Sequence, residues 1–473
     1  MASPDLERIR LLTDEGSFTE LHPDIPCTYR TGSAFVEGRP VMLCATRMEP
    51  LADVDLMEGI RRYLEAQDEA ARRRCPLVVL LDQPPPMRDG RGQWSREPDR
   101  LLADPTCCLG SVYQRHATLS GEVPQVGVLF GQVNAALSFP VAMCDVAILL
   151  DGSAMRIGPP RLVKTMIGED ADPATLGSAA VHCAVTGSGD VLVHTEAEAL
   201  AWARAWLSCL PSHRTQSSPR VGSLPPPAAP EGGLASLMPE EPAWGCDMRR
   251  LLPYLVDGAK FLEMKGSLAS EVLTGFARFD GVVAGVVASH SKSRGGALFP
   301  ETCRKMVHFI TLCDAWRIPL VFLADVPGFM VGTQNERSGA VRDAALLFSV
   351  LGNARVGRLL VVLRKAYTAG LYAMGGPGFV PRGYYAVPGA TISTFGKPLL
   401  DMLATLDEFA PEERQGFLEM SQECGHPEVL VEKGLLDGVI SLDGLRDALT
   451  DFVHREAAVG VGEDVLRRPV LRV

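Results

Sequence analysis

The chain has 473 residues, enough for two or three domains, and its composition of 47% hydrophobic and 22% charged residues is typical of a water-soluble globular protein. The formal net charge of −11 argues against a nucleic-acid-binding surface. Residues 1–20 lack the apolar core of a signal peptide and no apolar run spans a bilayer, so we expect a cytoplasmic protein with no membrane partner.

Cysteine and histidine are scattered along the chain. The 12 Cys form no CxxC pair, and the 9 His form no HxxxH or HExxH pattern. Cys107 and Cys108 are adjacent, which suits neither a zinc knuckle nor an easy disulfide. We therefore expect reduced thiols and no metal site.

The first half alternates between predicted helices and strands. In chain order it holds a helix at Asp55–Arg74, a buried strand LVVLLD that ends at Asp82, a helix at 107–119, a strand at 126–130, small residues at 134–136 that open a helix, and the strand segment VAILLDGSAMRIG. Such alternation predicts mostly parallel sheets with helical crossovers.

The second half repeats this order after a linker. Residues 207–245 are rich in Pro, Ser and Gly, so we expect domains at 1–206 and 246–473. The second domain has predicted helices at 300–316 and 340–353, strands LVFLAD and 359–363, small residues at 368–370, and the segment YYAVPGATISTFG. Two unrelated α/β domains could look alike by chance, but the matching order and spacing favour a duplication.

The stretch VVLRKAYTAGLYAMGG, residues 361–376, places small residues where a buried strand turns into a helix. Close packing of the strand and helix is one explanation for Thr368, Ala369 and Gly370. The other is that the helix start presents free backbone N–H groups to a bound molecule.

Several longer stretches resemble a known family. They are SRGGALFPETCRKMVHFITLCDAWRIPLVFLADVPGFMVGTQNERSGAVRDAALL, RKAYTAGLYAMGG, DMRRLLPYLVDGAKFLE, GFARFDGVVAGVVA and LLDGVI in the second half, and, less closely, ERIRLLTDEGSFTEL and SGEVPQVGVLFG in the first. Together they are similar to the carboxyltransferase (beta) subunit of biotin-dependent acyl-CoA carboxylases, in the crotonase-like superfamily.

This resemblance implies an α/β fold of two tandem crotonase-like (ClpP/crotonase) β-β-α superhelix domains. It also implies a homo-oligomer, at least a dimer and in many relatives a hexamer, in which the N-half of one subunit faces the C-half of another. Acyl-CoA would lie mainly on the N-half and carboxybiotin on the C-half. The chain has no Ala-Met-Lys-Met biotinylation sequence, so biotin would arrive on a separate carrier with its biotin carboxylase.

The resemblance also implies site residues. Backbone amides of Ala369 and Gly370 would stabilise the ureido oxygen of biotin, and those of Ala135 and Ala136 the thioester oxygen. The expected substrate-binding residues are Tyr372, Phe329, Gly332, Arg294, Gly295 and Gly296. A rigid turn, a surface charge or a core position would explain Phe329, Arg294 or Tyr372 without a ligand.

The N-half departs from the family pattern. Where relatives have Asp-Ser-Gly-Gly-Ala-Arg, residues 82–88 read DQPPPMR, and proline has no N–H to donate. Where relatives have Gly-Pro-Cys-Ala-Gly-Gly-Ala, residues 131–137 read GQVNAAL, and Glu49-Pro50-Leu51 stands near the expected Gly-Gly-Ser. Arg72–Arg74 is a candidate for the CoA phosphates, although a charge run at a helix end is more often a solvated cap.

Three functions fit this pattern. The first is a carboxyltransferase with an unusual acyl group, carried on CoA or on a carrier protein. The second is a biotin-independent decarboxylase, or a related enolate-forming enzyme, that acts on a malonyl-type thioester. The third is a non-catalytic subunit that supports a carboxylase complex.

Overall fold

The computed structural model describes residues 3–51, 55–86, 98–241, 244–422, 425–459 and 466–473. The chain forms two compact units, each described by itself below. The first unit is Met1–Pro219 together with Val461–Arg472, and the second is Arg220–Gly460 with Val473. The division expected from the sequence, which keeps everything after 246 in one domain, does not include the return of 461–472 to the first unit.

The sheet of the first unit has the strand order β1-β2-β3-β4-β5-β7-β9, antiparallel as far as β3 and parallel beyond it. Strands β6 and β8 form a separate parallel pair. The bounds are β1 Thr19–Glu20, β2 Tyr29–Val36, β3 Arg39–Thr46, β4 Leu77–Leu81, β5 Gln125–Leu129, β6 Gln132–Asn134, β7 Val146–Leu150, β8 Ala154–Arg156 and β9 Val191–Val193.

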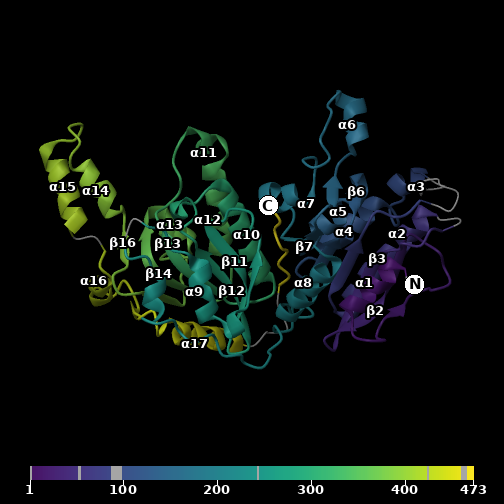
Figure 1. The fold of residues 1–473 in the computed structure, drawn as a ribbon, viewed down its shortest axis with the longest axis horizontal. Helices are drawn as coiled ribbons and strands as arrows, with labels where there is room; N and C mark the ends of the chain where they lie inside the picture. The colour runs from purple at the N-terminus through teal and green to yellow at the C-terminus, as the bar shows by residue number, and fades with distance from the viewer. Residues whose placement is uncertain (1–2, 52–54, 87–97, 242–243, 423–424, 460–465) are drawn as a thin grey trace. The chain divides into compact units, whose positions relative to one another are not determined.

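Helices cover both faces of this sheet (Figure 1), so every residue of β4 and β5 is buried. Helices α2, α4 and α5 share one core with the strands, while α1 packs against α8. Helix α6 projects from the body of the unit (Figure 1). The bounds are α1 Pro4–Leu12, α2 Leu56–Arg73, α3 Pro98–Ala103, α4 Leu109–Leu119, η1 Ala135–Leu137, α5 Phe139–Met143, α6 Pro160–Ile167, α7 Ala179–Val181, η2 His182–Thr186 and α8 Glu196–Cys209.

The sheet of the second unit repeats this topology in the order β10-β11-β12-β13-β14-β15-β17, again antiparallel first and parallel afterwards. Strand β16 pairs with the far end of β14. The bounds are β10 Phe261–Met264, β11 Val272–Phe279, β12 Val282–Ser289, β13 Leu320–Val326, β14 Arg358–Tyr367, β15 Gly383–Ala386, β16 Thr391–Ser393 and β17 Gly438–Val439.

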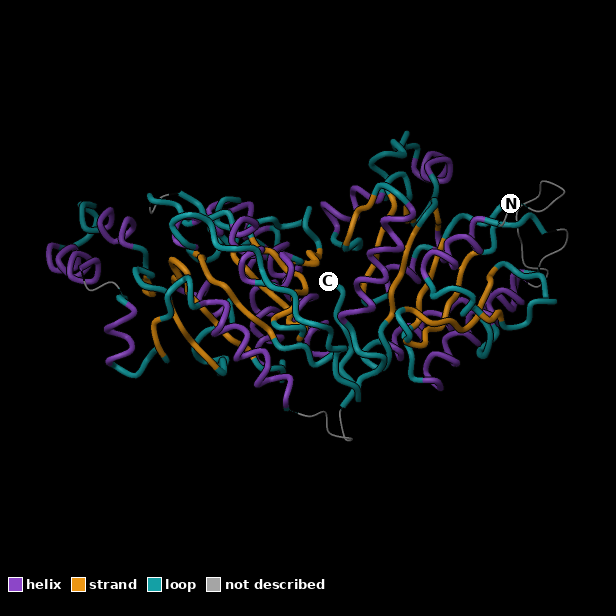
Figure 2. Tube along the Cα trace, turned by 60° about the horizontal axis from the view of Figure 1, so that its bottom comes forward, coloured by secondary structure: helices purple, strands orange, loops and turns teal. Residues whose placement is uncertain are grey.

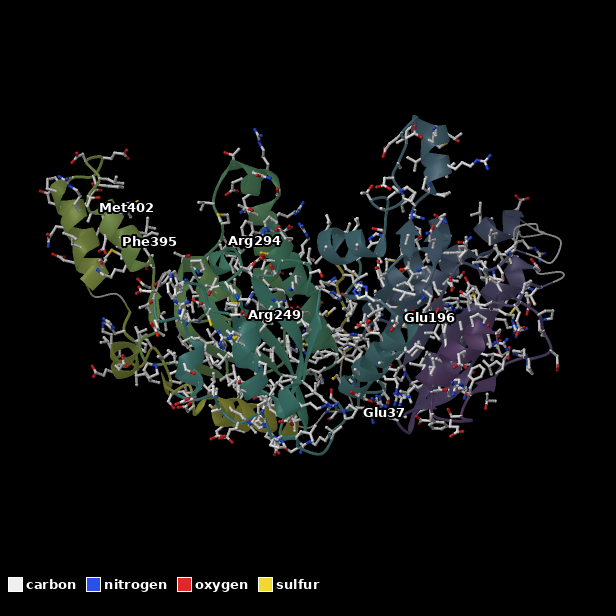
Figure 3. The ribbon with its side chains drawn as sticks, viewed as in Figure 1. Glu37, Glu196, Arg249, Arg294, Phe395 and Met402 are labelled. Carbon is white, nitrogen blue, oxygen red and sulfur yellow. The ribbon has the colours of Figure 1, made fainter. Side chains whose placement is uncertain are left out.

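Helices also flank this second sheet, as the purple and orange segments of Figure 2 show. Helix α10 packs on α12, and α17 packs on β11 and β12. Helices α14 and α15 project from the unit, and Figure 3 labels Met402 on α14. The bounds are η3 Leu234–Leu237, α9 Met248–Leu255, η4 Asp257–Ala259, η5 Arg294–Gly296, α10 Pro300–Ala315, α11 Thr333–Arg337, α12 Ala340–Asn353, α13 Thr368–Ala373, α14 Lys397–Leu403, α15 Pro411–Gln422, α16 Pro427–Glu432 and α17 Leu445–Ala458.

The predicted alternation and the parallel sheets are confirmed. Asp55 caps α2 by accepting from the amide of Met57, and the left-handed Arg74 ends this helix, which explains the predicted bounds. Helix α8 runs to Cys209, so the segment without regular structure starts later than residue 207.

Within the described ranges, no helix is long and apolar enough to cross a membrane. The cysteines of the same ranges are free thiols.

Candidate active site

In the second unit, strand β14 passes directly into helix α13. Tyr367 ends the strand and Thr368 begins the helix with a left-handed φ of 48°. A β-branched residue rarely adopts this conformation, so the turn is strained. The next two residues are Ala369 and Gly370, and the first N–H groups of a helix have no acceptor within it. The turn therefore offers backbone donors at the carboxyl end of a parallel strand.

The first unit has an equivalent turn, but the strand that leads into it is divided into β5 and β6. Asn134 ends β6 opposite Arg156 of β8, as Tyr367 ends β14 opposite Ser393 of β16. The following residue, Ala135, has a φ of 51°, which matches Thr368. The position that matches Ala369 is therefore Ala136, whereas the sequence interpretation set Ala135 opposite Ala369.

Gly370 is packed too tightly for a side chain. A Cβ atom there would come within 2.9 Å of both the Gly328 Cα and the Val326 Cγ2. The loop after β13 thus lies against the start of α13. This packing accounts for the glycine by itself, because a side chain at 370 would meet the loop after β13.

Tyr113 and Ser138 hold the corresponding turn in the first unit. The Tyr113 hydroxyl donates to the Ala136 carbonyl at 3.0 Å. The Ser138 hydroxyl bonds to the carbonyls of Val133, at 3.2 Å, and Arg156, at 2.9 Å. Leu137 occupies the position equivalent to Gly370, so hydroxyl hydrogen bonds replace the close glycine contact. Neither Tyr113 nor Ser138 was identified from the sequence.

The loop after β13 contains Phe329 and Gly332. Phe329 pairs with Leu298 in a parallel bridge, and its ring lies 6.0 Å from that of Phe348. Gly332 directly precedes α11 and has open space around its Cα. Between them, Val331 is 81% exposed. The loop is fixed at Phe329 and open to solvent from there to α11.

Arg294, labelled in Figure 3, is held by two carboxylates. It makes ion pairs with the buried Glu271 at 2.6 Å and with Glu301 at 2.9 Å, and its guanidinium lies 3.7 Å from the centre of the Phe299 ring. Burial lowers the pKa of Arg294, but the hydrogen bonds to both carboxylates outweigh it and leave that pKa raised. Arg294 is therefore an anchored residue rather than a free surface charge.

Gly295 and Gly296 differ in their surroundings, although they are neighbours. A Cβ atom at Gly295 would meet open space, whereas one at Gly296 would lie 2.7 Å from the Asp325 carbonyl oxygen. The loop that Arg294 anchors is therefore packed against the end of β13. Tyr372, on α13, is 45% exposed and available for contact from outside the unit.

Each unit also has an aspartate at the end of the fourth strand in its sheet order, the fully buried Asp325 in β13 and the partly buried Asp82 directly after β4. Asp325 makes ion pairs with Arg364 at 3.2 Å and Lys365 at 3.6 Å, and it accepts from Ser291. Asp82 pairs with Arg8 at 2.8 Å. The sequence marked both aspartates as strand ends but carried no signal for their partners, which lie up to 74 residues away.

The proline-rich loop of the first unit is described as far as Pro86, and Met87 and Arg88 lie outside the described residues. Arg72 and Arg73 both pair with Glu69, at 2.6 and 2.7 Å, on an exposed helix end. This is the pattern of a solvated helix cap. Among the described residues, no group of three or more His, Cys, Asp or Glu could hold a metal ion.

The comparisons with known proteins decide the family. Residues 6–450 match the carboxyl transferase domain family. This chain belongs to that family. It is 36% identical over 400 residues to the uncharacterized carboxylase YngE of Bacillus subtilis, covering 82% of this chain and 76% of that protein. It is 29% identical over 454 residues to the propionyl-CoA carboxylase beta chain of Roseobacter denitrificans, covering 92% and 86%.

A solved structure agrees with this family. The transcarboxylase 12S hexamer, with methylmalonyl-coenzyme A bound, has a TM-score of 0.85 and 25% identity, covering 98% of this chain and 92% of that one. The expected crotonase-like fold is confirmed. The chain is a carboxyltransferase of the acyl-CoA carboxylase type, and its activity is carboxyl transfer with acyl-CoA.

Proposed function

We propose that the chain moves a carboxyl group between carboxybiotin, bound to a separate carrier protein, and the α-carbon of an acyl thioester. The observation that carries the proposal is the pair of equivalent turns after β6 and β14. Each has a strained residue, Ala135 or Thr368, directly followed by the free amides of a helical turn. Two such turns suit a reaction in which two oxygens gain negative charge.

The residues present fit both groups. Carboxybiotin supplies CO2 and a ureido group that accepts the α-proton of the thioester. Amides at Ala369 and Gly370 hold the ureido oxygen. The equivalent amides of the first unit, which directly follow the strained Ala135, are those of Ala136 and Leu137, and they hold the thioester oxygen as the enolate forms. The α-carbon loses its C–H bond and gains a C–C bond to CO2, so no acid or base side chain is required.

Phe329, Gly332, Tyr372 and the loop Arg294–Gly296 form the wall around the biotin-side turn. The proposal is supported by the exposure of Tyr372 and by the anchored Arg294 beside the end of β13. The site is complete only in a homo-oligomer, in which the N-half of one copy faces the C-half of another. The hexamer named for the related transcarboxylase supports this assembly.

The test uses the full chain with a biotinylated carrier, biotin carboxylase, ATP, ¹³C-bicarbonate and a panel of acyl-CoA and acyl-carrier thioesters, read by mass spectrometry. A ¹³C-carboxylated thioester that depends on the carrier supports the proposal. CO2 release from malonyl-type thioesters without the carrier indicates a decarboxylase. No product with any thioester, from chain that assembles normally, indicates a non-catalytic subunit.

A further inference from the structure

Residues 466–472 lie on the first unit, although they follow the second unit in sequence. We call Leu466–Arg472 the return segment. Arg467 donates to the carbonyls of Ala117 and Thr118, at 3.1 and 2.8 Å, near the end of α4. The amide of Val470 donates to the Ser120 hydroxyl at 2.9 Å. The segment is therefore hydrogen-bonded through both its backbone and its side chains.

Arg472 makes the most extensive of these contacts. Its guanidinium donates to the carbonyls of Cys144, at 2.9 Å, and Asp145, at 3.1 Å, and to that of Ser188 at 2.7 Å. It also pairs with the fully buried Asp190 at 2.8 Å, while its own side chain is only 13% exposed. A largely desolvated arginine with this many partners is costly to remove.

Cys144 and Asp145 follow the end of helix α5, whose last residue is Met143. The last carbonyls of a helix find no N–H donor within the helix, and a cation that donates to carbonyls there is favourable. Asp190 in turn accepts from the amide of Ala147 in β7. Arg472 thus ties α5 to the starts of β7 and β9. The turn at Ala135 and Ala136 directly precedes α5, at the end of this helix that lies opposite Cys144.

Gly121 shows how closely the return segment is seated. Its φ is +71°, and a Cβ atom added there would overlap the carbonyl oxygen of Arg468. The backbone of the segment therefore lies directly on the turn after α4. Any side chain at 121 would have to displace it.

We propose that the return segment is a clasp that orders α5 and the adjoining strand ends of the first unit, and so positions the turn at Ala135 and Ala136. Its consequence for catalysis rests on the proposed function, whereas the clasp itself does not. The surface formed by the ends of α4 and α5 and the starts of β7 and β9 is thus occupied by a segment of the same chain, through Arg467 and Arg472. Arg472 is a positioning residue, since it reaches the turn only through α5.

The test compares full-length variants by hydrogen exchange resolved to peptides. Gly121→Ala displaces the segment, and Gly152→Ala is its matched control, because Gly152 also has a positive φ, of +84°, but open space around it. Arg472→Ala removes the ion pair, Arg472→Lys restores a cation, and Arg161→Ala controls for loss of an exposed arginine on α6.

We expect Gly121→Ala and Arg472→Ala to raise exchange at least tenfold in residues 135–149 and 466–472, with no change in the second unit. We expect Arg472→Lys to recover part of the protection. In the carboxylation assay, the same two variants should lose kcat about tenfold with KM for the thioester changed less than twofold. Unchanged exchange in residues 135–149 for both variants would overturn the clasp. Raised exchange with normal kcat would remove its positioning role and leave the proposed function standing.

Discussion

Gly370 lies directly against Gly328, so that a Cβ atom added at 370 would come within 2.9 Å of the Gly328 Cα. This contact joins the loop after β13 to the start of α13 and fixes where the amides lie that we propose to bind the biotin ureido oxygen. A substitution at 370 therefore changes the stability of the second unit through packing, and any loss of activity has to be compared with that loss of stability.

We expect Gly370→Ala to destabilise the second unit by about 1–3 kcal/mol, because the methyl group meets backbone that cannot move aside. Gly416→Ala is the control, since Gly416 lies in α15 with open space around it, and alanine there should be neutral or stabilising. Urea unfolding of both variants measures this difference. Equal stability of the two variants would refute the packing argument.

Ala135 and Ala136 should respond differently to glycine. Ala135 has a φ of 51°, so Ala135→Gly relieves strain and should stabilise the first unit by about 1 kcal/mol. Ala136 has no such strain, and Ala136→Gly should be neutral or mildly destabilising. Both variants should keep activity and accept bulkier acyl groups, because a methyl group is lost. Thermal unfolding and the acyl panel check the two expectations separately.

Arg294→Ala should destabilise the second unit by about 2–3 kcal/mol, because it leaves the fully buried Glu271 without its cation. The double variant Arg294→Ala with Glu271→Gln should recover most of that loss, since the amide needs no counter-charge. If Arg294 also contacts a ligand, the double variant will regain stability but keep a raised KM. Stability that does not recover in the double variant would contradict the ion-pair account.

Acid should weaken the first unit through His116. This residue is buried between the Tyr63 hydroxyl, at 2.9 Å, and Gln125, at 2.7 Å, and burial lowers its pKa to about 4. The unfolded chain binds the proton near pH 6.5, so the stability present above pH 6.5 is lost as the pH falls toward 4, by about 3 kcal/mol in total. Urea unfolding at pH 7.5 and 5.0 should show a flatter response in His116→Gln than in the native chain. The same slope in both proteins would exclude His116 as the cause.

Much of the fold could be predicted because its signals are local. Asp55 and Arg74 are recognisable helix ends, and the short, β-branched apolar runs before Asp82 and Asp325 favour buried strands. The register of the first-unit turn could not be predicted. In the first unit, Phe130 and Gly131 separate strand β5 from strand β6, whereas in the second unit β14 continues as one strand to Tyr367.

The contacts that hold the site together were beyond prediction for a different reason. Tyr113 reaches Ala136 across 23 residues, and Arg472 reaches Asp190 across 282. No periodicity or motif links residues so far apart in sequence. The candidate amides themselves came from family resemblance, and their chemical role stays a prediction.

The central claim is that the backbone N–H of Ala369 stabilises charge during carboxyl transfer. Replacing Ala369 with lactic acid changes only this amide to an ester, so it removes the donor and keeps the side chain and the contact at Gly370. The control replaces Glu412, in the exposed first turn of α15, with 2-hydroxyglutaric acid, which likewise changes only the amide to an ester. We expect kcat to fall about 10²–10³-fold at 369 with little change in KM or unfolding temperature, and no fall at 412. A correctly folded ester variant at 369 with normal kcat would contradict the account.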